Sequence, residues 1–375
     1  MRIAVDARSV FQDASVRGIG KSLIGLYSAL AVARPRWQFD LYYQDSAGRP
    51  NPFAGVPQIT PRRVSGPGDR FNGWLDFWLP FTAWRSGAAV LHCHGNTAPR
   101  YSRVPLVTTI HDLTLLTYPT ASPDLPKWVR NVRRAARNSR RILTPSEDAR
   151  RDIADRMNVS ADKIEVIRWG LTDSIRRTED ADLSRAVRER YELSGPYLLH
   201  FGMTLPRKNT GQVIDAWARL TAAERGTATL LIVGVESAAG VETFRARAAT
   251  AGVSDSCAIR GYVPEEDVAP LLSAAAGLVY VPLAEGFGMP VLDAFTCETP
   301  VLASDCSSVP EVAGDAAVLV NPHDSVAIAA GMAKLLTDPS LADRLRAAGR
   351  DRVGEFTWEA CADQVARAFE QVARR

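Results

Sequence analysis

Two successive series of short apolar segments, each alternating with helix-like segments, constrain the fold of this chain more than any other feature. Strand-like runs of the first series occur at residues 2–7, 39–44, 88–94, 104–112, 141–146 and 164–170. Helix-like patterns at 20–33 and 127–139 lie between them. Strands that alternate with helices typically form a parallel sheet covered by helices. The first part of the chain is therefore predicted to be an α/β domain.

The same alternation restarts after a polar interruption. Residues 176–195 are highly charged and poor in β-branched residues, so they are interpreted as a connector. Strand-like runs follow at 196–202, 227–234, 257–263, 277–282, 300–305 and 316–322. We predict domains at 1–175 and 196–356, with a last helix at about 357–375 that joins the first domain. Ligands bind at the carboxyl ends of such strands, so the active site is expected in a cleft between the two domains.

Composition narrows the class of protein. Of 375 residues, 46% are hydrophobic and 23% are charged, which is typical of a folded protein. A net charge of +3 is small for this length and argues against a nucleic-acid partner. The first ten residues meet charges too early for a signal peptide, and no apolar run reaches about 18 residues. We expect a cytoplasmic protein whose five scattered cysteines are reduced.

Two histidines alternate in the stretch VLHCHGN. On a strand, His92 and His94 point to one face and could form a metal site with His111. No further cluster of ligands accompanies them, so the favoured interpretation is that they are strand-end residues lining a cleft.

The stretch SVRGIGKSL, at 15–23, nearly spells a phosphate-binding P-loop. That motif needs Gly, four residues, and then Gly-Lys-Ser or Gly-Lys-Thr. Gly20, Lys21 and Ser22 fit its end, but Ser15 stands at the position of the first glycine. A dinucleotide-binding loop would need a third glycine, which GIGKSL lacks. The stretch is therefore assigned to neither class.

The densest stretch is EGFGMPVLDA, which follows the strand-like run GLVYVP. Gly286 and Gly288 permit close backbone approach, and Pro290 suits the start of a helix. A helix N-terminus attracts a diphosphate, while the carboxylates of Glu285 and Asp293 can accept hydrogen bonds from sugar hydroxyls. Asp293 is expected in the first turn of that helix, where simple capping would also explain it.

A second cationic stretch, GMTLPRKNTGQ, follows the strand-like run PYLLHF. Arg207 and Lys208 precede a helix that Asn209 or Thr210 could cap. Paired cations beside helix N–H groups form a diphosphate pocket and can stabilise a departing diphosphate. Alone, such a pair is usually a solvated loop, but its occurrence with EGFGMP in one domain favours the binding site.

Taken in order, these stretches resemble the retaining glycosyltransferase family 4, whose GT-B fold has two Rossmann-like domains facing a cleft. The resemblance covers nearly the whole chain and is carried by VDAR, GIGKS, TIHD, TPSEDARRDI, GMTLPRKN, LLIVG, RGYVPEEDV, EGFGMPVLDA and PVLASDCSSVPEVAGDAAVLVNP. It implies an N-terminal acceptor-binding domain and a C-terminal domain that binds a nucleotide sugar. The family signature is Glu, seven residues, Glu; here the second acid is Asp293.

The resemblance also implies roles for single residues. Glu285 would hold donor sugar hydroxyls, Arg207 and Lys208 would neutralise the diphosphate without a metal or other cofactor, and His111 would contact the transferred sugar. The nucleotide base would lie near Tyr262 and Val263, and the ribose near Asp293. Gly234 would keep the neighbouring strand end open. Further donor contacts are implied for Gly18, Gly20, Gly202, Gly286, Phe287, Gly288 and Met289. Asp180 and Asp182, which match the metal-binding Asp-x-Asp of other glycosyltransferases, are interpreted as solvated connector charges because no strand precedes them.

Residues 127–141 contain seven basic residues and no acid. On one helix these residues would occupy an arc of about 140°. One interpretation is a basic face that holds the protein to an anionic membrane, on its inner face, where a lipid-linked acceptor lies. The other is an ordinary amphipathic helix. The nearby stretch FNGWLDFWLPFTAW could form an acceptor or membrane surface, but the near-helical spacing of its aromatic residues favours a helix packed into the first domain.

The sequence therefore predicts a metal-independent, retaining hexosyltransferase that moves mannose from GDP-mannose to a glycan or lipid-linked glycan. Use of a UDP- or dTDP-sugar by the same fold remains an alternative. So does a nucleotide-sugar isomerase or hydrolase, although no dedicated acid/base pair is identified for one. A non-catalytic membrane scaffold would keep the basic helix but would not need Glu285, Arg207 and Lys208 together.

Overall fold

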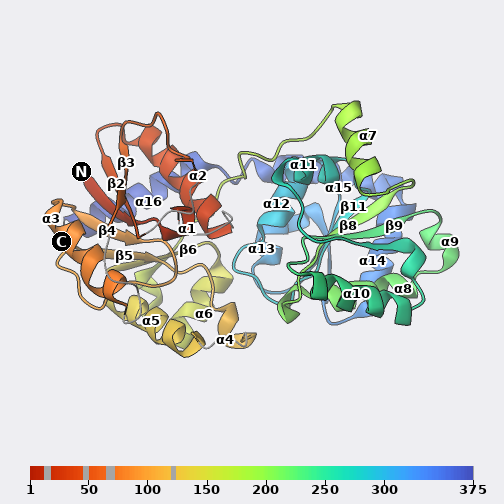
Figure 1. The fold of residues 1–375 in the computed structure, drawn as a ribbon, viewed down its shortest axis with the longest axis horizontal. Helices are drawn as coiled ribbons and strands as arrows, with labels where there is room; N and C mark the ends of the chain where they lie inside the picture. Colours follow the sequence, from red (N-terminus) through yellow and green to blue (C-terminus); the bar gives the residue numbers. More distant parts are fainter. Residues whose placement is uncertain (12–17, 45–49, 65–71, 120–123, 375) are drawn as a thin grey trace. The chain divides into compact units, whose positions relative to one another are not determined.

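The computed structural model describes residues 1–11, 18–44, 50–64, 72–119 and 124–374. The chain divides into two compact units (Figure 1). Unit 1 comprises Met1–Gly170 and Phe356–Arg375, and unit 2 comprises Leu171–Glu355. Ser15 and Phe71, which belong to two of the stretches considered above, lie outside the described residues.

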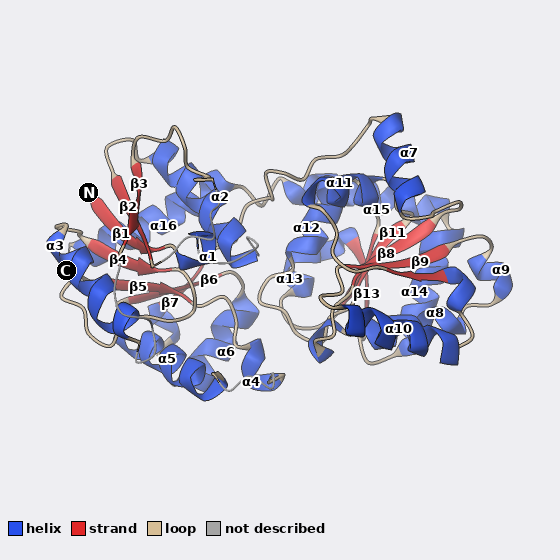
Figure 2. Cartoon of the chain, in the orientation of Figure 1, coloured by secondary structure: helices blue, strands red, loops and turns tan. Residues whose placement is uncertain are grey.

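Unit 1 is built on a parallel sheet with helices on both faces (Figure 2). In its described part the sheet has the strand order β3-β2-β1-β4-β5-β6-β7. The strands are β1 (Arg2–Asp6), β2 (Gln38–Tyr43), β3 (Ile59–Arg63), β4 (Val90–Cys93), β5 (Leu106–Thr109), β6 (Arg141–Thr144) and β7 (Ile164–Val166). The sequence analysis did not predict β3. Every residue of the central strands β4 and β5 is buried, as expected for strands of a parallel sheet that is covered on both faces.

Helices α2 and α16 pack against each other on one face of this sheet, and α5 and α6 cover the other (Figure 1). The longer helices are α2 (Gly18–Ala33), α3 (Leu79–Arg85), α5 (Leu125–Asn138), α6 (Glu147–Met157) and α16 (Trp358–Ala373). Shorter segments are α1 (Arg8–Phe11), the π-helical η2 (Trp74–Trp78), α4 (Thr114–Thr117) and η3 (Ala161–Lys163). Helix α16 thus returns the end of the chain to unit 1.

Helix α5 is shorter than the basic segment 127–141 suggested. It ends at Asn138, because Ser139 adopts an extended backbone. Arg140 lies beyond the helix, and Arg141 is the first residue of β6. The prediction that all seven basic residues share one helical face is therefore wrong for these two arginines.

Unit 2 repeats the architecture with a smaller sheet. Within the described residues, its strand order is β10-β9-β8-β11-β12-β13, and all pairs are parallel. The strands are β8 (Tyr197–Phe201), β9 (Thr229–Val233), β10 (Cys257–Ile259), β11 (Gly277–Tyr280), β12 (Val301–Ser304) and β13 (Ala317–Val320). Each of them falls inside one of the strand-like runs predicted from the sequence.

Helices cover both faces of this second sheet (Figure 2). Helices α8 (Thr210–Arg219), α10 (Ala238–Thr250) and α14 (Ser325–Thr337) cover one face, and α11 (Glu265–Ser273), α12 (Met289–Thr296) and α15 (Pro339–Val353) cover the other. The remaining segments are α7 (Ala181–Arg190), η4 (Pro206–Lys208), α9 (Ala222–Arg225), η5 (Ser254–Ser256), α13 (Val309–Ala313) and η6 (Gly314–Ala316). Large side chains such as Trp217 fill the space between helices and sheet.

The predicted connector 176–195 is not simply a linker, because it contains α7. Asp180 caps this helix by accepting hydrogen bonds from the backbone N–H groups of Asp182 and Leu183, at 2.9 and 3.0 Å. Arg190, at its last turn, pairs with the buried Asp267 of α11 at 2.6 Å. The charges of this segment therefore cap α7 and attach it to unit 2.

Both sheets change winding direction between two neighbouring central strands. In unit 1 the change falls between β1 and β4, and in unit 2 between β8 and β11. Connections leave such a pair of strands in opposite directions, so a crevice opens at their carboxyl ends where ligands bind. The topology therefore identifies one candidate edge in each unit. None of the described helices combines the length and apolar character that crossing a bilayer requires.

Trp358, the first residue of α16, anchors the end of the chain between two glycines of unit 1. A Cβ on Gly170 would lie 2.6 Å from the Trp358 backbone nitrogen. A Cβ on Gly25 would overlap the Trp358 indole from α2. Both glycines therefore leave the space that Trp358 occupies.

We expect Gly170→Ala to lower the free energy of unfolding by about 1–3 kcal/mol, because the added methyl overpacks this contact. The measurement is the urea midpoint of unfolding. Gly73→Ala is the matched control, since nothing lies within 4 Å of a Cβ at that position. Equal midpoints for the two variants would contradict the proposed anchoring role of Trp358.

Candidate active site

Charged residues cluster at the winding change of unit 2. Arg207 and Lys208 lie in η4, which follows β8, and Glu285 follows the neighbouring strand β11. Since β8 and β11 are parallel, their carboxyl ends meet at the same edge of the sheet. Residues 77 and 78 positions apart in the sequence are therefore brought into contact, as the sequence analysis expected for a shared binding site.

The three side chains form one ion-pair cluster. Arg207 Nη1 donates to Glu285 Oε1 at 2.7 Å, and Lys208 Nζ donates to the same oxygen. All three side chains are less than 20% exposed, so the surrounding water screens them only weakly. Two cations against one carboxylate leave a net positive charge, which suits an anionic ligand such as a diphosphate.

Main-chain hydrogen bonds fix the two loops that carry the cluster. The backbone N–H of Leu283 donates to the Arg207 carbonyl at 2.7 Å. Asn209, in a left-handed conformation with φ of 63°, donates from Nδ2 to the carbonyls of Val281 and Pro322. Neither Asn209 nor Thr210 caps α8 in the way that the sequence suggested, because Asn209 makes no side-chain cap and Thr210 is the first helical residue. The amide of Asn209 instead holds the loop after β8 against β11.

Two serines after β12 hold the glycine-rich loop. Ser307 Oγ accepts from the Glu285 backbone N–H at 3.1 Å and donates to the Glu285 carbonyl at 2.8 Å. Ser308 Oγ lies 2.9 Å from the carbonyls of Glu285 and Phe287. The serine hydroxyls thus fix the main chain on both sides of Gly286.

Gly288 precedes α12, and Met289 and Pro290 form its first residues. Gly288 has φ of 113°, a conformation that only glycine adopts without strain. Asp293 is the fifth residue of α12 and not part of its first turn, so the prediction of its position is wrong. Helix capping therefore does not explain this aspartate.

The other predicted donor-side residues also lie at carboxyl ends of strands. Gly202 follows β8, and a Cβ there would lie 2.5 Å from Ile232, so packing alone requires glycine. Gly234 follows β9 with φ of 83°. Tyr262 and Val263 follow β10, and the Tyr262 ring is 80% exposed. The structure thus places them along one edge of the sheet.

Two buried polar side chains, Tyr280 and His200, lie close to the ion-pair cluster. Burial raises the pKa of Tyr280 well above its ordinary value, and the Glu285 charge adds to this. Its ring lies 5.7 Å from Lys208 Nζ. His200 donates from Nδ1 to the Val279 carbonyl at 2.9 Å, and its Nε2 lies 3.1 Å from Thr210 Oγ1. Burial lowers the pKa of His200 to about 4, so this histidine is neutral near pH 7.

The predicted residues Gly18, Gly20 and His111 lie in unit 1. Helix α2 begins at Gly18, two residues before the predicted start. Gly18 and Gly20 therefore lie in its first turn and not in a loop, which corrects that expectation. Gly18 is exposed and Gly20 is buried.

Three histidines pack together at the winding change of unit 1. His92 lies at the end of β4, His94 follows it, and His111 follows β5. His94 and His111 meet edge to face with ring centroids 4.9 Å apart, and Trp169 covers both at 5.6 Å. Burial lowers the pKa of all three, that of His92 to about 3.

Hydroxyl and carbonyl groups form hydrogen bonds with the imidazole rings of His92 and His111. His92 bonds to Tyr27 and Thr109, and His111 Nε2 donates to the His94 carbonyl at 2.7 Å. Among the described residues, no group of three His, Cys, Asp or Glu side chains is arranged to hold a metal ion. The three histidines therefore form a neutral hydrogen-bonded cluster in unit 1.

Solved structures identify the class to which this architecture belongs. Sucrose-phosphate synthase from Thermosynechococcus elongatus superposes with a TM-score of 0.76 and 21% identity, covering 99% of this chain and 98% of that one. Anabaena HepE in complex with UDP and glucose gives a TM-score of 0.76 and 18% identity, covering 99% of this chain and all of the other. These likenesses show the GT-B fold of two Rossmann-like domains, as predicted.

Sequence comparison then gives the family. Residues 16–174 match the model Glycosyltransferase Family 4, and residues 187–352 match the model Glycosyl transferases group 1. O-antigen chain mannosyltransferase B of Escherichia coli is 32% identical over 270 residues, which cover 70% of each chain. This chain belongs to glycosyltransferase family 4.

Several residues of the site escaped sequence reasoning. Ser307, Ser308 and His200 contribute through hydrogen bonds to distant main-chain groups, which no local pattern reveals. Their position in the sequence could have indicated them, because each of these three residues lies within a few residues of the carboxyl end of a strand. Ser22 and His94 were noticed in the sequence, but their contact was not predicted.

His200 makes folding stability depend on pH. Above about pH 6.5 the imidazole is neutral in both the folded and the unfolded chain. As the pH falls from 6.5 to about 4, the unfolded chain gains a proton that folded His200 does not, so stability is lost. The expected loss is about 3 kcal/mol.

We expect His200→Gln to remove this component, so that its unfolding free energy falls less steeply between pH 6.5 and 4 than that of the wild type. Urea titrations across this range measure the difference. His323→Gln, which changes an exposed histidine of the same unit, is the control. Parallel curves for wild type and His200→Gln would contradict the assignment.

Proposed function

We propose that this glycosyltransferase moves mannose from GDP-mannose to a glycan or lipid-linked glycan, with retention of configuration and without a metal ion. The main support for a donor site is the contact of Glu285 with Arg207 and Lys208 at the winding change of unit 2. One carboxylate for sugar hydroxyls and two cations for a diphosphate match the two ends of an activated sugar.

The relatives support the choice of sugar. The E. coli protein that is 32% identical is named a mannosyltransferase. HepE was crystallised with UDP and glucose at 18% identity, so a UDP-sugar is the competing candidate. The proposed acceptor, a glycan, follows from the O-antigen chain named for the E. coli relative.

The proposed chemistry uses charge and position. Arg207 and Lys208 stabilise the negative charge that develops on the departing diphosphate. Glu285 keeps the sugar hydroxyls in place, and His111 accepts a hydrogen bond from the transferred sugar. The acceptor attacks the face from which the diphosphate leaves, and the diphosphate takes the acceptor proton. The base, ribose and phosphate contacts assigned to Tyr262, Val263, Asp293 and the glycine-rich loop belong to this proposal.

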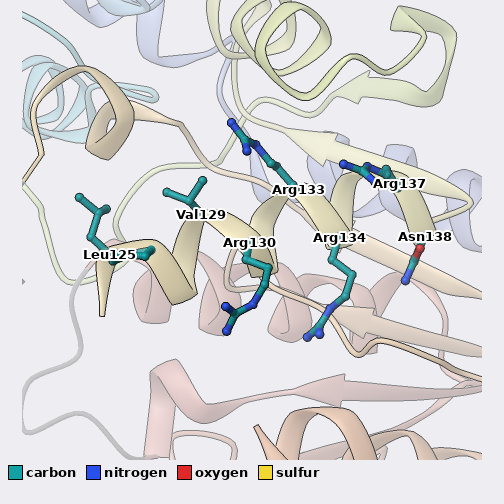
Figure 3. A pocket seen from close by; sticks show the side chains of 8 residues that line it. Leu125, Val129, Arg130, Arg133, Arg134, Arg137 and Asn138 are labelled. Carbon is teal, nitrogen blue, oxygen red and sulfur yellow. The ribbon is translucent and has the colours of Figure 1, made fainter. Parts of the chain in front are cut away.

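We also propose that unit 1 binds an anionic membrane, where a lipid-linked acceptor would lie. Along α5 runs a groove of about 710 Å³, with Leu125 and Val129 near its N-terminal end (Figure 3). Arg133 and Arg137 extend to one side of the helix and Arg130 to the other (Figure 3). These three arginines are exposed, whereas Arg134 pairs with Asp76 of η2 at 2.8 Å.

An exposed aromatic surface lies beside this helix, because the Arg134–Asp76 pair joins α5 to η2. Trp74, Leu75 and Leu79 of η2 and α3 are buried, as the sequence analysis expected. The other face of the same segment exposes large side chains, namely Phe77, Trp78, Phe81 and Trp84. Arg103 lies over Trp84 at 4.9 Å. Aromatic rings flanked by arginines are typical of surfaces that enter the headgroup region of a bilayer.

The donor assignment predicts which nucleotides stabilise the protein. At about one hundred times its dissociation constant, GDP-mannose should add about 2.7 kcal/mol to the free energy of unfolding and raise the melting temperature by several degrees. Lys208→Ala should lose protection by both GDP and GDP-mannose. Glu285→Gln should keep protection by GDP but lose much of the additional protection from mannose, because it frees the cations and replaces the charged hydroxyl acceptor by a weaker neutral one.

Differential scanning fluorimetry measures these shifts, and Lys334→Ala, on exposed α14, is the matched charge control. If only UDP- or dTDP-sugars protect, GDP-mannose is not the donor. If GDP protects Lys208→Ala as well as the control, the diphosphate role of Lys208 is wrong.

The membrane proposal predicts binding to vesicles that contain phosphatidylglycerol. Replacing Arg130, Arg133 and Arg137 by Gln should weaken partitioning about a hundredfold, since each arginine near an anionic surface contributes about 1 kcal/mol. The double variant Phe81→Ser/Trp84→Ser should also weaken it. Vesicle flotation is the measurement.

The control removes three exposed arginines of unit 2, Arg185, Arg219 and Arg344, so that the total charge change is the same. Equal loss in control and test variants would show a nonspecific charge effect and would reject the surface. Phosphatidylcholine vesicles should bind neither variant nor wild type strongly.

A further inference from the structure

The Gly-Lys-Ser sequence that resembled a P-loop has a different structural partner. Ser22 lies in α2, 5% exposed, and its Oγ is 2.9 Å from His94 Nε2. The same hydroxyl donates to the Ile19 carbonyl at 2.9 Å. Helix α2 follows β1 and His94 follows β4, so this contact lies at the winding change of unit 1. Ser22 therefore ties the start of α2 to the segment after β4.

That segment in turn holds His111 at two points. The His111 ring donates from Nε2 to the His94 carbonyl at 2.7 Å. The His111 backbone N–H donates to Asn96 Oδ1, also at 2.7 Å. Asn96 is buried, in a left-handed conformation with φ of 63°. Residues 94 and 96 thus fix both the ring and the main chain of His111.

These bonds determine where the protons lie. A carbonyl only accepts, so Nε2 of His111 carries the proton and Nδ1 has the lone pair. The Ser22 proton is used by Ile19, so His94 donates from Nε2 to Ser22. His94 Nδ1 is then a buried lone pair with no hydrogen-bond partner among the described residues. The opposite tautomer would leave a buried N–H without an acceptor, which is rarer in proteins.

We propose that Ser22 and His94 are positioning residues for His111: through the His94 carbonyl they fix the His111 tautomer that offers Nδ1 as hydrogen-bond acceptor to a hydroxyl of the donor sugar. This inference rests on the proposed function, because it assigns a hydroxyl-bearing ligand to His111. It adds two residues and a proton position that neither the family resemblance nor the comparisons supply.

A purely structural role explains the arrangement less well. An apolar side chain of similar volume at position 94 would fill the same space without a buried, unpaired nitrogen, and such replacements cost little when both partners are removed. The imidazole instead keeps one satisfied and one unsatisfied nitrogen directly against the His111 ring. The hydrogen bond to Ser22 determines that Nε2 of His94 carries the proton and that Nδ1 does not.

The first arm of the test observes the tautomers directly. The chain has five histidines, so long-range proton–nitrogen NMR spectra of protein labelled with ¹⁵N-histidine can be assigned by single His→Gln variants. We expect wild-type His94 and His111 each to be a single tautomer protonated at Nε2. In Ser22→Ala both should become mixtures, whereas Ser22→Thr, which keeps the hydroxyl, should restore the wild-type signals.

A matched control makes the same chemical change elsewhere in unit 1. Ser139 is also buried, donates to the Ala135 carbonyl at 2.7 Å and bonds to Thr108 at 2.7 Å. Ser139→Ala should leave the His94 and His111 signals unchanged. His94→Gln, whose amide can donate to Ser22, provides a second test variant should Ser22→Ala fold poorly, and it should keep His111 protonated at Nε2.

The second arm measures the consequence for the sugar. The probes are GDP and GDP-mannose, and the readout is the affinity advantage of GDP-mannose over GDP. Ser22→Ala should reduce this advantage in proportion to the fraction of His111 that no longer carries its proton on Nε2, about twofold for an equal mixture of tautomers, and leave GDP affinity unchanged. Ser22→Thr and Ser139→Ala should retain it.

The two arms separate the possible failures. If His111 remains a single Nε2-protonated tautomer in Ser22→Ala, or if the tautomers mix without any loss of the mannose advantage, the positioning role is overturned. If wild-type protein shows no advantage for any nucleotide sugar over its nucleotide, the proposed function fails, and the NMR result still decides the tautomer network.

Discussion

The ion pair of Glu285 with Arg207 and Lys208 is the interaction on which the donor side of this molecule depends. Two cations and a carboxylate that are mostly removed from water would be costly apart, because each would lose its hydration without a partner. Together they stabilise the loops after β8 and β11 before any ligand arrives. In the function proposed above, a diphosphate replaces the carboxylate on the two cations, and sugar hydroxyls replace the cations on the carboxylate. These internal contacts therefore hold the two loops together in this structure.

The neutral groups around this cluster explain why it stays in position. Ser307 and Ser308 bind the main chain of Glu285 and Phe287, and Asn209 fixes the loop that carries the two cations. None of these groups adds charge. Neutral hydrogen bonds to the backbone orient the charged side chains without competing for the diphosphate, as expected for groups that support a binding site.

Much of this could be predicted from the sequence, and the exceptions have physical causes. The unit 2 strands were found because buried parallel strands are continuously apolar, whereas β3 was missed because its sequence, ITPRR, contains a proline and two arginines. A proline is tolerated there because β3 is the edge strand of its sheet. Glu285, Arg207 and Lys208 were predicted as a group, since their spacing after strands and their resemblance to a family agreed. The contact of Ser22 with His94 was not predicted, because His94 lies 72 residues away and no local pattern indicates such a contact.

The two units place different kinds of side chain at the winding change of their sheets, and electrostatics explains the difference. Unit 2 gathers charge there, where an anionic ligand can compensate the cost of burying it. Unit 1 gathers histidines whose pKa values are lowered by burial, so these three side chains stay neutral near pH 7. Under the proposed mechanism, a second cationic site would compete for the diphosphate and would hinder its acceptance of a proton from the attacking hydroxyl. A neutral imidazole with a fixed lone pair can bind a sugar hydroxyl without either effect. This division requires the tautomer of His111 to be set by its neighbours, because at neutral charge only the position of one proton distinguishes an acceptor from a donor.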